Sequence, residues 1–183
     1  VGASFYYNQT AKNGTKPWRN TGYKFPVTIV TGDLQYKGFN NNLIVRGNAV
    51  YGNLGASGAL TTINNSSSAA SGYPNTTVAQ NAVSYGGEAG YNIGSFFHSK
   101  APRIYPFIRY EYYNPMEKTE ANTGLLADKR FQVSAVTAGL NYYALPNLVI
   151  KADYTHRSIG GGKYNDENLV SVGIAYIGWF IKK

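Results

Sequence analysis

Apolar and polar residues alternate along most of this 183-residue chain, and turn residues separate the alternating stretches. A period of two places successive side chains on opposite faces of a β-strand. No helical period competes with it, so we expect an all-β fold. The pattern predicts eight strands, over residues 1–9, 25–38, 42–54, 82–97, 103–114, 130–144, 147–157 and 168–180.

The connections between these strands differ in length in a regular way. Those after the second, fourth and sixth strands are short, with the sequences GFNN, HSKA and LPN. The others are long and cover about 10–24, 55–81, 115–129 and 158–167. Short turns at one end and long loops at the other are typical of an antiparallel up-and-down transmembrane β-barrel, whose short turns are periplasmic. A Greek-key sandwich does not separate its loops by length. We therefore expect one domain over 1–183 in a bacterial outer membrane.

Aromatic residues cluster at the predicted strand ends, on both sides of a middle rich in aliphatic residues, Ala and Gly. Such clusters match the two aromatic girdles of a membrane barrel, where rings lie in lipid and hydroxyls reach water. In the sixth strand, Phe131 and Val133 fall out of phase with Val136 and Leu140, which predicts a bulge or an earlier exit from the membrane. The periplasmic group includes Tyr36, Phe39, Phe96, Tyr105, Tyr142 and Trp179, and the opposite group includes Tyr6, Tyr23, Tyr51, Tyr112 and Tyr154.

Charged residues within the strands share the face opposite the apolar one. In residues 104–115, IYPFIRYEYYNP, one face carries Ile104, Ile108 and Tyr112, and Arg109 and Glu111 fall on the other. If lipid covers the apolar face, the charged face lines the inside of a barrel. The predicted lining set holds three cations and four anions, namely Asp33, Arg46, Glu88, Arg109, Glu111, Lys151 and Asp153.

Composition narrows the chemistry further. The chain has no Cys, so it has neither disulfides nor Cys-based metal sites. Two histidines, His98 and His156, fall at opposite ends of the predicted barrel and cannot share a metal, so we expect no metal and no cofactor. No apolar run approaches a membrane helix. No amino-terminal signal peptide is present and the first residue is Val, so we expect a processed chain or a piece of a longer one.

The net charge of +8 belongs mainly to the predicted rims, with Lys12, Lys16, Arg19 and Lys24 around the first long loop. No basic stripe with stacking aromatics remains, so we expect no nucleic-acid partner. The first loop is a candidate contact for lipopolysaccharide phosphates, or simply a soluble rim. Loop 55–81 carries no charge, and either lies at the surface or folds inward to narrow a pore.

The segments YPFIRYEYYNPM, LNYYALPNLVIKADYTHRS and NDENLVSVGIAYIGWF carry a family pattern, as do NNLIVRGNAVYG and GGEAGYNIGSFF. With them the chain resembles the carboxy-terminal half of porin-like outer-membrane proteins of the phosphate-selective porin O and P type, particularly those of Bacteroidetes. The resemblance implies a passive pore of about sixteen strands, of which this chain supplies eight. The family's anion pathway depends on basic residues. The predicted lining here is mixed, so phosphate selectivity is not carried over.

These observations predict a non-enzymatic channel for small polar or anionic solutes, with outer-membrane lipid and lipopolysaccharide around it; an oligomer or larger membrane complex stays open. One alternative is a closed eight-stranded barrel with a structural or adhesive role, filled by its own side chains. Another is a hydrolase, because His156 and Ser158 in THRS resemble the His-x-Ser of outer-membrane lipid A deacylases. That resemblance implies a carboxylate at position 170, where this chain has Val170; Asp166 and Glu167 are the nearby acids.

Overall fold

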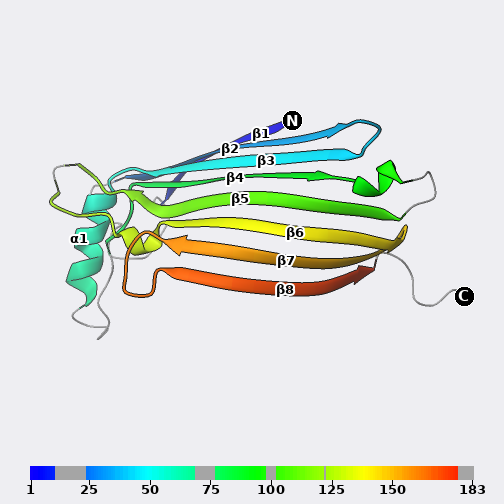
Figure 1. Cartoon of the computed structure of the whole chain (residues 1–183). Coiled ribbons are helices and arrows are strands. Elements are labelled where there is room, and N and C mark those ends of the chain that lie inside the picture. Colours follow the sequence, from blue (N-terminus) through cyan, green and yellow to red (C-terminus); the bar gives the residue numbers. More distant parts are fainter. Residues whose placement is uncertain (11–23, 69–76, 98–101, 122, 177–183) are drawn as a thin grey trace, which may run out of the picture.

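A computed structural model of the chain contains one eight-stranded sheet, and it describes residues 1–10, 24–68, 77–97, 102–121 and 123–176. Each strand pairs antiparallel with the next along the chain, as Figure 1 shows. The predicted all-β, up-and-down arrangement is therefore confirmed. The strands are β1 (Gly2–Thr10), β2 (Phe25–Gly38), β3 (Leu43–Leu54), β4 (Asn81–Tyr91), β5 (Arg103–Lys118), β6 (Val133–Leu145), β7 (Leu148–Ile159) and β8 (Asp166–Tyr176).

Within the described residues, three strands differ by more than two residues from the predicted bounds, and one of them, β5, continues past 114 to Lys118. The sequence extended the fourth strand to residue 97, but β4 ends at Tyr91 and the 3-10 helix η2 (Ile93–Phe96) follows. Asn92 ends the strand, because its side chain donates to Asn42 Oδ1 at 3.0 Å and accepts the Ile104 amide at 3.0 Å. Before β6, the 3-10 helix η3 (Lys129–Phe131) takes the place of the first predicted strand residues, which accounts for Phe131. Val133 belongs to β6 and is buried on the side of the sheet opposite Val136.

The described short turns lie together at one end of the sheet. The β2–β3 turn places Phe39, Asn40 and Asn41 at positive φ, a conformation that Asn tolerates better than most residues. The β6–β7 connection needs only residues 146–147. The predicted HSKA turn and most of loop 10–24 lie outside the described residues. The described parts of the long connections lie at the other end of the sheet (Figure 1).

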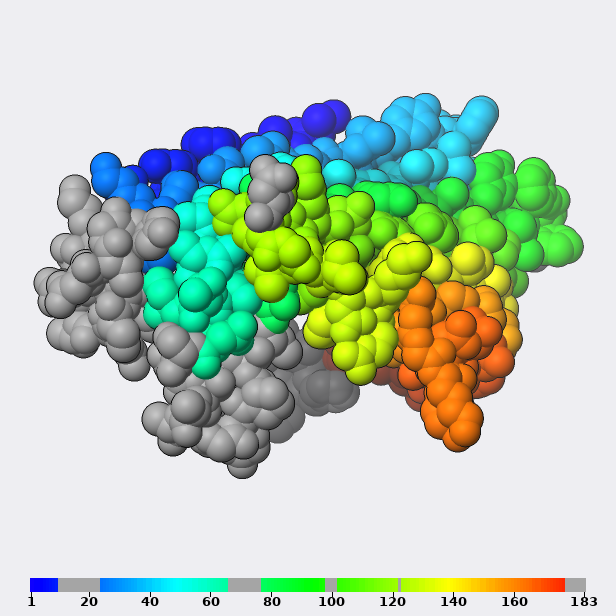
Figure 2. Space-filling view, turned by 90° about the vertical axis from the view of Figure 1, so that its left-hand side faces the viewer, coloured from blue at the N-terminus to red at the C-terminus, as the bar shows by residue number. Residues whose placement is uncertain are grey.

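Over the residues that the structure describes, the sheet is open, because β1 and β8 are its two edges and do not pair with each other. The alternative of a closed eight-stranded barrel is therefore wrong for this structure. The sheet is nevertheless curved, since residues of β3 and of β8 line one hollow of about 360 Å³. Seen along the strands in Figure 2, the chain follows an arc from β1, in blue, past green β4 and β5 to the orange residues before β8. Eight strands thus complete an arc and leave two unpaired edges.

A helix within loop 55–81 was not predicted. Helix α1 (Ser57–Ser68) lies at the long-loop end of the sheet (Figure 1). The Gly58 amide donates to Glu120 Oε2 at 2.5 Å, and the Val78 amide donates to Thr61 Oγ1 at 2.9 Å. Ser57 and Thr61 are buried. The segment is rich in Ser, Thr and Asn, which are poor helix formers, so these tertiary contacts account for a helix that local propensity does not indicate.

Few large apolar side chains are buried within the described residues. The buried hydrophobic residues are Phe25, Tyr105, Met116 and Val133. By contrast, one face of the sheet exposes large apolar side chains on every strand, which a soluble monomer rarely does over a wide area. These residues include Phe5, Tyr7, Val30, Leu34, Tyr36, Tyr51, Tyr85, Ile108, Tyr110, Val136, Leu140, Tyr142, Ile150, Tyr154, Val170, Val172, Ile174 and Tyr176.

Candidate functional site: the polar face of the sheet

The seven residues predicted to line a barrel all lie on one face of the sheet. Residues paired across strands share a face, as do alternate residues along a strand. Arg46 pairs with Glu88 and Glu88 with Arg109, and the same row continues through Thr137 to Thr155. We call this side the polar face and the opposite side the apolar face. The polar face holds Asp33, Arg46, Glu88, Arg109, Glu111, Lys151 and Asp153.

Glu88 holds two guanidinium groups at the centre of the polar face. Arg109 donates from Nε at 2.9 Å and from Nη2 at 2.6 Å to Glu88 Oε2, and Arg46 Nη1 reaches Oε1 at 3.4 Å. The Glu88 side chain is 19% exposed, whereas those of Arg109 and Arg46 are 40% and 57% exposed. The tight pair therefore joins Glu88 and Arg109, and Arg46 keeps most of its donors available to water or a solute.

A second cluster on the polar face was not predicted. Arg157 Nη1 donates to Glu167 Oε2 at 2.6 Å, and its Nη2 donates to the Tyr113 hydroxyl at 3.0 Å. The sequence placed Arg157 at the last position of a strand and Glu167 in a loop, so neither entered the predicted set. Their pairing follows from the β7–β8 register, in which Arg157 lies opposite Glu167. The sequence could have placed Arg157 on this face, because Arg157 lies four residues from Asp153 along the same strand.

The remaining predicted residues share the polar face without joining an ion pair. Within the described part of the chain, Asp33, Glu111, Lys151 and Asp153 make no salt bridge. Glu111 follows Arg109 on the same face of β5, but Arg109 binds Glu88 on the neighbouring strand instead. The structure therefore brings together three of the seven residues in ion pairs and leaves the other four outside them.

Two hollows lie on the polar face. The first, of about 380 Å³, is lined by Asp33, Arg46, Glu88, Arg109 and Glu111 together with uncharged neighbours. The second lies nearer the long-loop end and is bounded by Glu111, Tyr113 and Arg157 and by residues of β8. Gly86 lines both hollows, and only its backbone borders them because it has no side chain.

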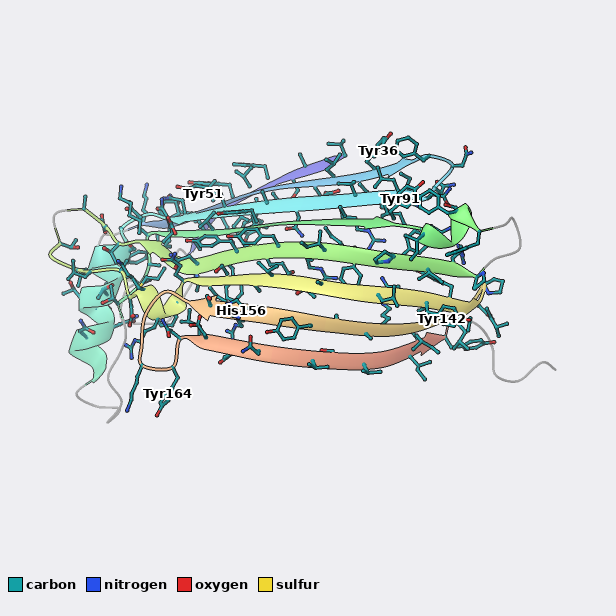
Figure 3. The ribbon with its side chains drawn as sticks, in the orientation of Figure 1. Tyr36, Tyr51, Tyr91, Tyr142, His156 and Tyr164 are labelled. Carbon is teal, nitrogen blue, oxygen red and sulfur yellow. The ribbon has the colours of Figure 1, made fainter. Side chains whose placement is uncertain are left out.

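The apolar face carries aromatic residues at both ends of the strands. In Figure 3, Tyr36, Tyr91 and Tyr142 lie at the short-turn end and Tyr51 lies at the long-loop end. Tyr85 stacks on Tyr112 with ring centroids 4.9 Å apart. Aliphatic residues such as Ile108 lie between the two groups. This is the order of side chains that a girdled membrane surface requires.

His156 and Ser158 lie on the apolar face near the long-loop end (Figure 3 labels His156). His156 Nδ1 lies 2.9 Å from Asn168 Oδ1, and its Nε2 lies 3.3 Å from Ser158 Oγ. Ser158 Oγ also donates to Asp166 Oδ1 at 2.8 Å. Cross-strand pairing on β8 supplies both partners, whereas the resemblance had implied position 170.

Comparisons with protein-family models, with curated proteins and with solved structures found no match. Among the described residues, no helix is both long enough and apolar enough to span a membrane. The same residues include no cluster of His, Cys, Asp or Glu that could hold a metal ion. His98 lies outside the described residues.

Proposed function

We propose that this sheet forms part of the wall of a bacterial outer-membrane β-barrel through which small polar solutes, charged ones included, diffuse passively. The observation that carries the proposal is the division of side chains between the two faces. The apolar face exposes aliphatic and aromatic residues that favour lipid, and the polar face gathers ionised groups around hollows that favour water. A passive pore needs a wetted wall and a constriction, and no catalytic group.

The open edges of the sheet support a barrel larger than eight strands. Unpaired N–H and C=O groups at β1 and β8 cannot remain free within lipid, where no water satisfies them. Further strands must therefore pair with both edges in the complete barrel. The resemblance to proteins of about sixteen strands agrees with this requirement.

Conductance tests the proposal directly. The full-length protein, extracted in detergent and reconstituted into planar bilayers, should give stepwise conductance increases in KCl, and liposomes containing it should swell in small sugars. An equally concentrated sample that has been boiled, so that the barrel is unfolded, is the control. Folded protein that inserts into bilayers and conducts no ions would refute the channel.

Orientation has its own test. We expect the long loops outside the cell, in contact with lipopolysaccharide, and the short turns in the periplasm. A membrane-impermeant thiol reagent applied to intact cells should label Gly161→Cys and leave Asn41→Cys unlabelled. Both sites should react after lysis. Labelling of Asn41→Cys alone in intact cells would show the opposite orientation.

The hydrolase alternative is favoured by one observation, the contacts of Ser158. Donation from His156 Nδ1–H to Asn168 leaves Nε2 as the acceptor that a serine nucleophile needs. However, the hydroxyl lies 2.8 Å from Asp166 and 3.3 Å from the imidazole, so its proton is directed to the carboxylate in this arrangement. A fluorophosphonate probe should label the native protein, and not Ser158→Ala, if this site is a hydrolase. Absence of labelling would remove the alternative.

A further inference from the structure

The cations and the acids of the polar face differ in how far they are already neutralised. Each of its central arginines contacts a carboxylate: Arg46 and Arg109 contact Glu88, and Arg157 contacts Glu167. By contrast, Asp33, Glu111 and Asp153 form no ion pair within the described residues, and Lys151 is the corresponding unpaired cation of the predicted set. Among the described residues, Lys37 and Arg103 also lie on this face without a salt bridge, but at its short-turn end, so carboxylates outnumber cations only around the central hollow.

The hollow of about 380 Å³ has more carboxylates than cations in its lining. Its charged lining consists of two cations, Arg46 and Arg109, and three anions, Asp33, Glu88 and Glu111. Because Glu88 and Arg109 form the tight pair, the remaining groups are one loosely held guanidinium and two open carboxylates. The net charge of the lining is thus negative, although the whole chain carries +8.

Oxygen atoms also surround the floor of this hollow at Gly86. A Cβ atom placed on Gly86 would lie 3.0 Å from the Tyr110 carbonyl oxygen, 3.4 Å from Glu111 Cγ and 3.6 Å from Asn48 Oδ1. Glycine therefore lets the backbone lie close to its neighbours here, and the floor is bordered by the side chain of Glu111 and the amide oxygen of Asn48. Both groups accept hydrogen bonds, and an ammonium group has three donors to give. Arg46, two residues from Asn48 on the same face of β3, offers donors to a carboxylate or sulfonate.

From these contacts we infer that the hollow admits solutes by their cationic group, so that the pathway favours cations and zwitterions over anions. Glu111 and Asn48 receive the ammonium end of a zwitterion, Asp33 adds to the negative potential, and Arg46 holds the anionic end. This inference rests on the proposed channel function and names its solute class. It also predicts the opposite selectivity from the anionic solutes that the sequence allows.

Reversal potentials in a KCl gradient, measured across bilayers that contain the full-length protein, show whether the channel prefers cations or anions. We expect the wild-type channel to be cation-selective. Two unit charges in water interact by about 1 kcal/mol at about 4 Å, so removing one charge that lines the path should lower the cation-to-anion permeability ratio by roughly threefold or more. Glu111→Gln and Asp33→Asn should each do so, and Arg46→Gln should raise the ratio. The matched control is Asp166→Asn, an acid-to-amide change on the apolar face, which should leave the ratio unchanged.

Liposome swelling then tests the zwitterion. Taurine and isethionate share an ethanesulfonate skeleton, but taurine carries an ammonium group where isethionate carries a hydroxyl. Taurine should therefore enter the liposomes faster. In Glu111→Gln the two probes should enter at the same rate. An anion-selective wild-type channel, or equal entry of the two probes, would overturn the inference and leave the channel intact. A folded protein without conductance would instead refute the proposed function itself.

Discussion

Replacing Val170 by Arg tests whether lipid or water covers the apolar face. Val170 lies on the apolar face of β8 and is 78% exposed. It belongs to the row of Ile108, because Ile108 pairs with Ala138, Ala138 with Tyr154, and Tyr154 with Val170. In water, an arginine at so exposed a position should change the free energy of unfolding by no more than about 0.5 kcal/mol.

The magnitude in a bilayer follows from the depth of Val170. It lies four residues from Asp166 and six from Tyr176, the two ends of β8, or about 13 Å and about 20 Å along the strand. A strand tilt of about 45° converts these lengths to about 9 Å and about 14 Å of depth, so Val170 lies near the middle of an apolar band about 25 Å tall. An arginine at the midplane costs about 2–4 kcal/mol. The equilibrium constant for unfolding should therefore rise roughly 30- to 700-fold.

The neighbouring residue provides the control. Ser171 lies on the polar face, opposite Asp153 on β7, so Ser171→Arg places the same side chain next to a carboxylate. Urea unfolding in phospholipid bilayers, followed by heat-modified gel mobility, measures both variants. We expect a loss of stability for Val170→Arg and little change for Ser171→Arg. Equal stability of the two variants in bilayers would refute the assignment of lipid to the apolar face.

Three further predictions concern charged groups. Arg109→Glu and Lys151→Glu should shift the reversal potential toward cations in a folded protein, and an unchanged potential would show that these residues do not line the path. Glu88→Gln leaves the two guanidinium groups without their shared carboxylate and should lower the free energy of unfolding by about 1–3 kcal/mol in a urea titration. An unchanged free energy of unfolding would mean that water replaces the contacts of Glu88 with Arg46 and Arg109. In the loop before η3, hydrogen bonds and an ion pair from Arg130 lower the pKa of Asp128. The resulting stabilisation is complete above the ordinary pKa of about 4 and is lost as the pH falls through the depressed value. Asp128→Asn should remove this acid dependence, and NMR of the carboxyl carbon should show a pKa below the ordinary one.

Alternation alone was enough to predict the strands and their faces. Because the side-chain period of a strand is two, the neighbours of Arg109 along β5 already show which residues share its face. The same local rule placed Asp33, Arg46 and Lys151 on that face, and the lengths of the loops predicted the up-and-down order. These features depend on residues close together in the sequence, so one chain suffices to predict them.

Contacts between residues far apart in the sequence were decided by the register of the sheet. Arg109 binds Glu88, 21 residues away, and does not pair with Glu111 two positions along its own strand. Asn168 reaches His156 because β8 pairs with β7 in one particular register, and the Glu120 carboxylate meets the start of α1 from a distant loop. Alternation says which face a side chain takes, but not which partner lies opposite, since a shift of the strand by two residues would keep every face and change every pair. The faces were therefore determined by the sequence itself, and the ion pairs, the helix and the open edges only by the tertiary structure.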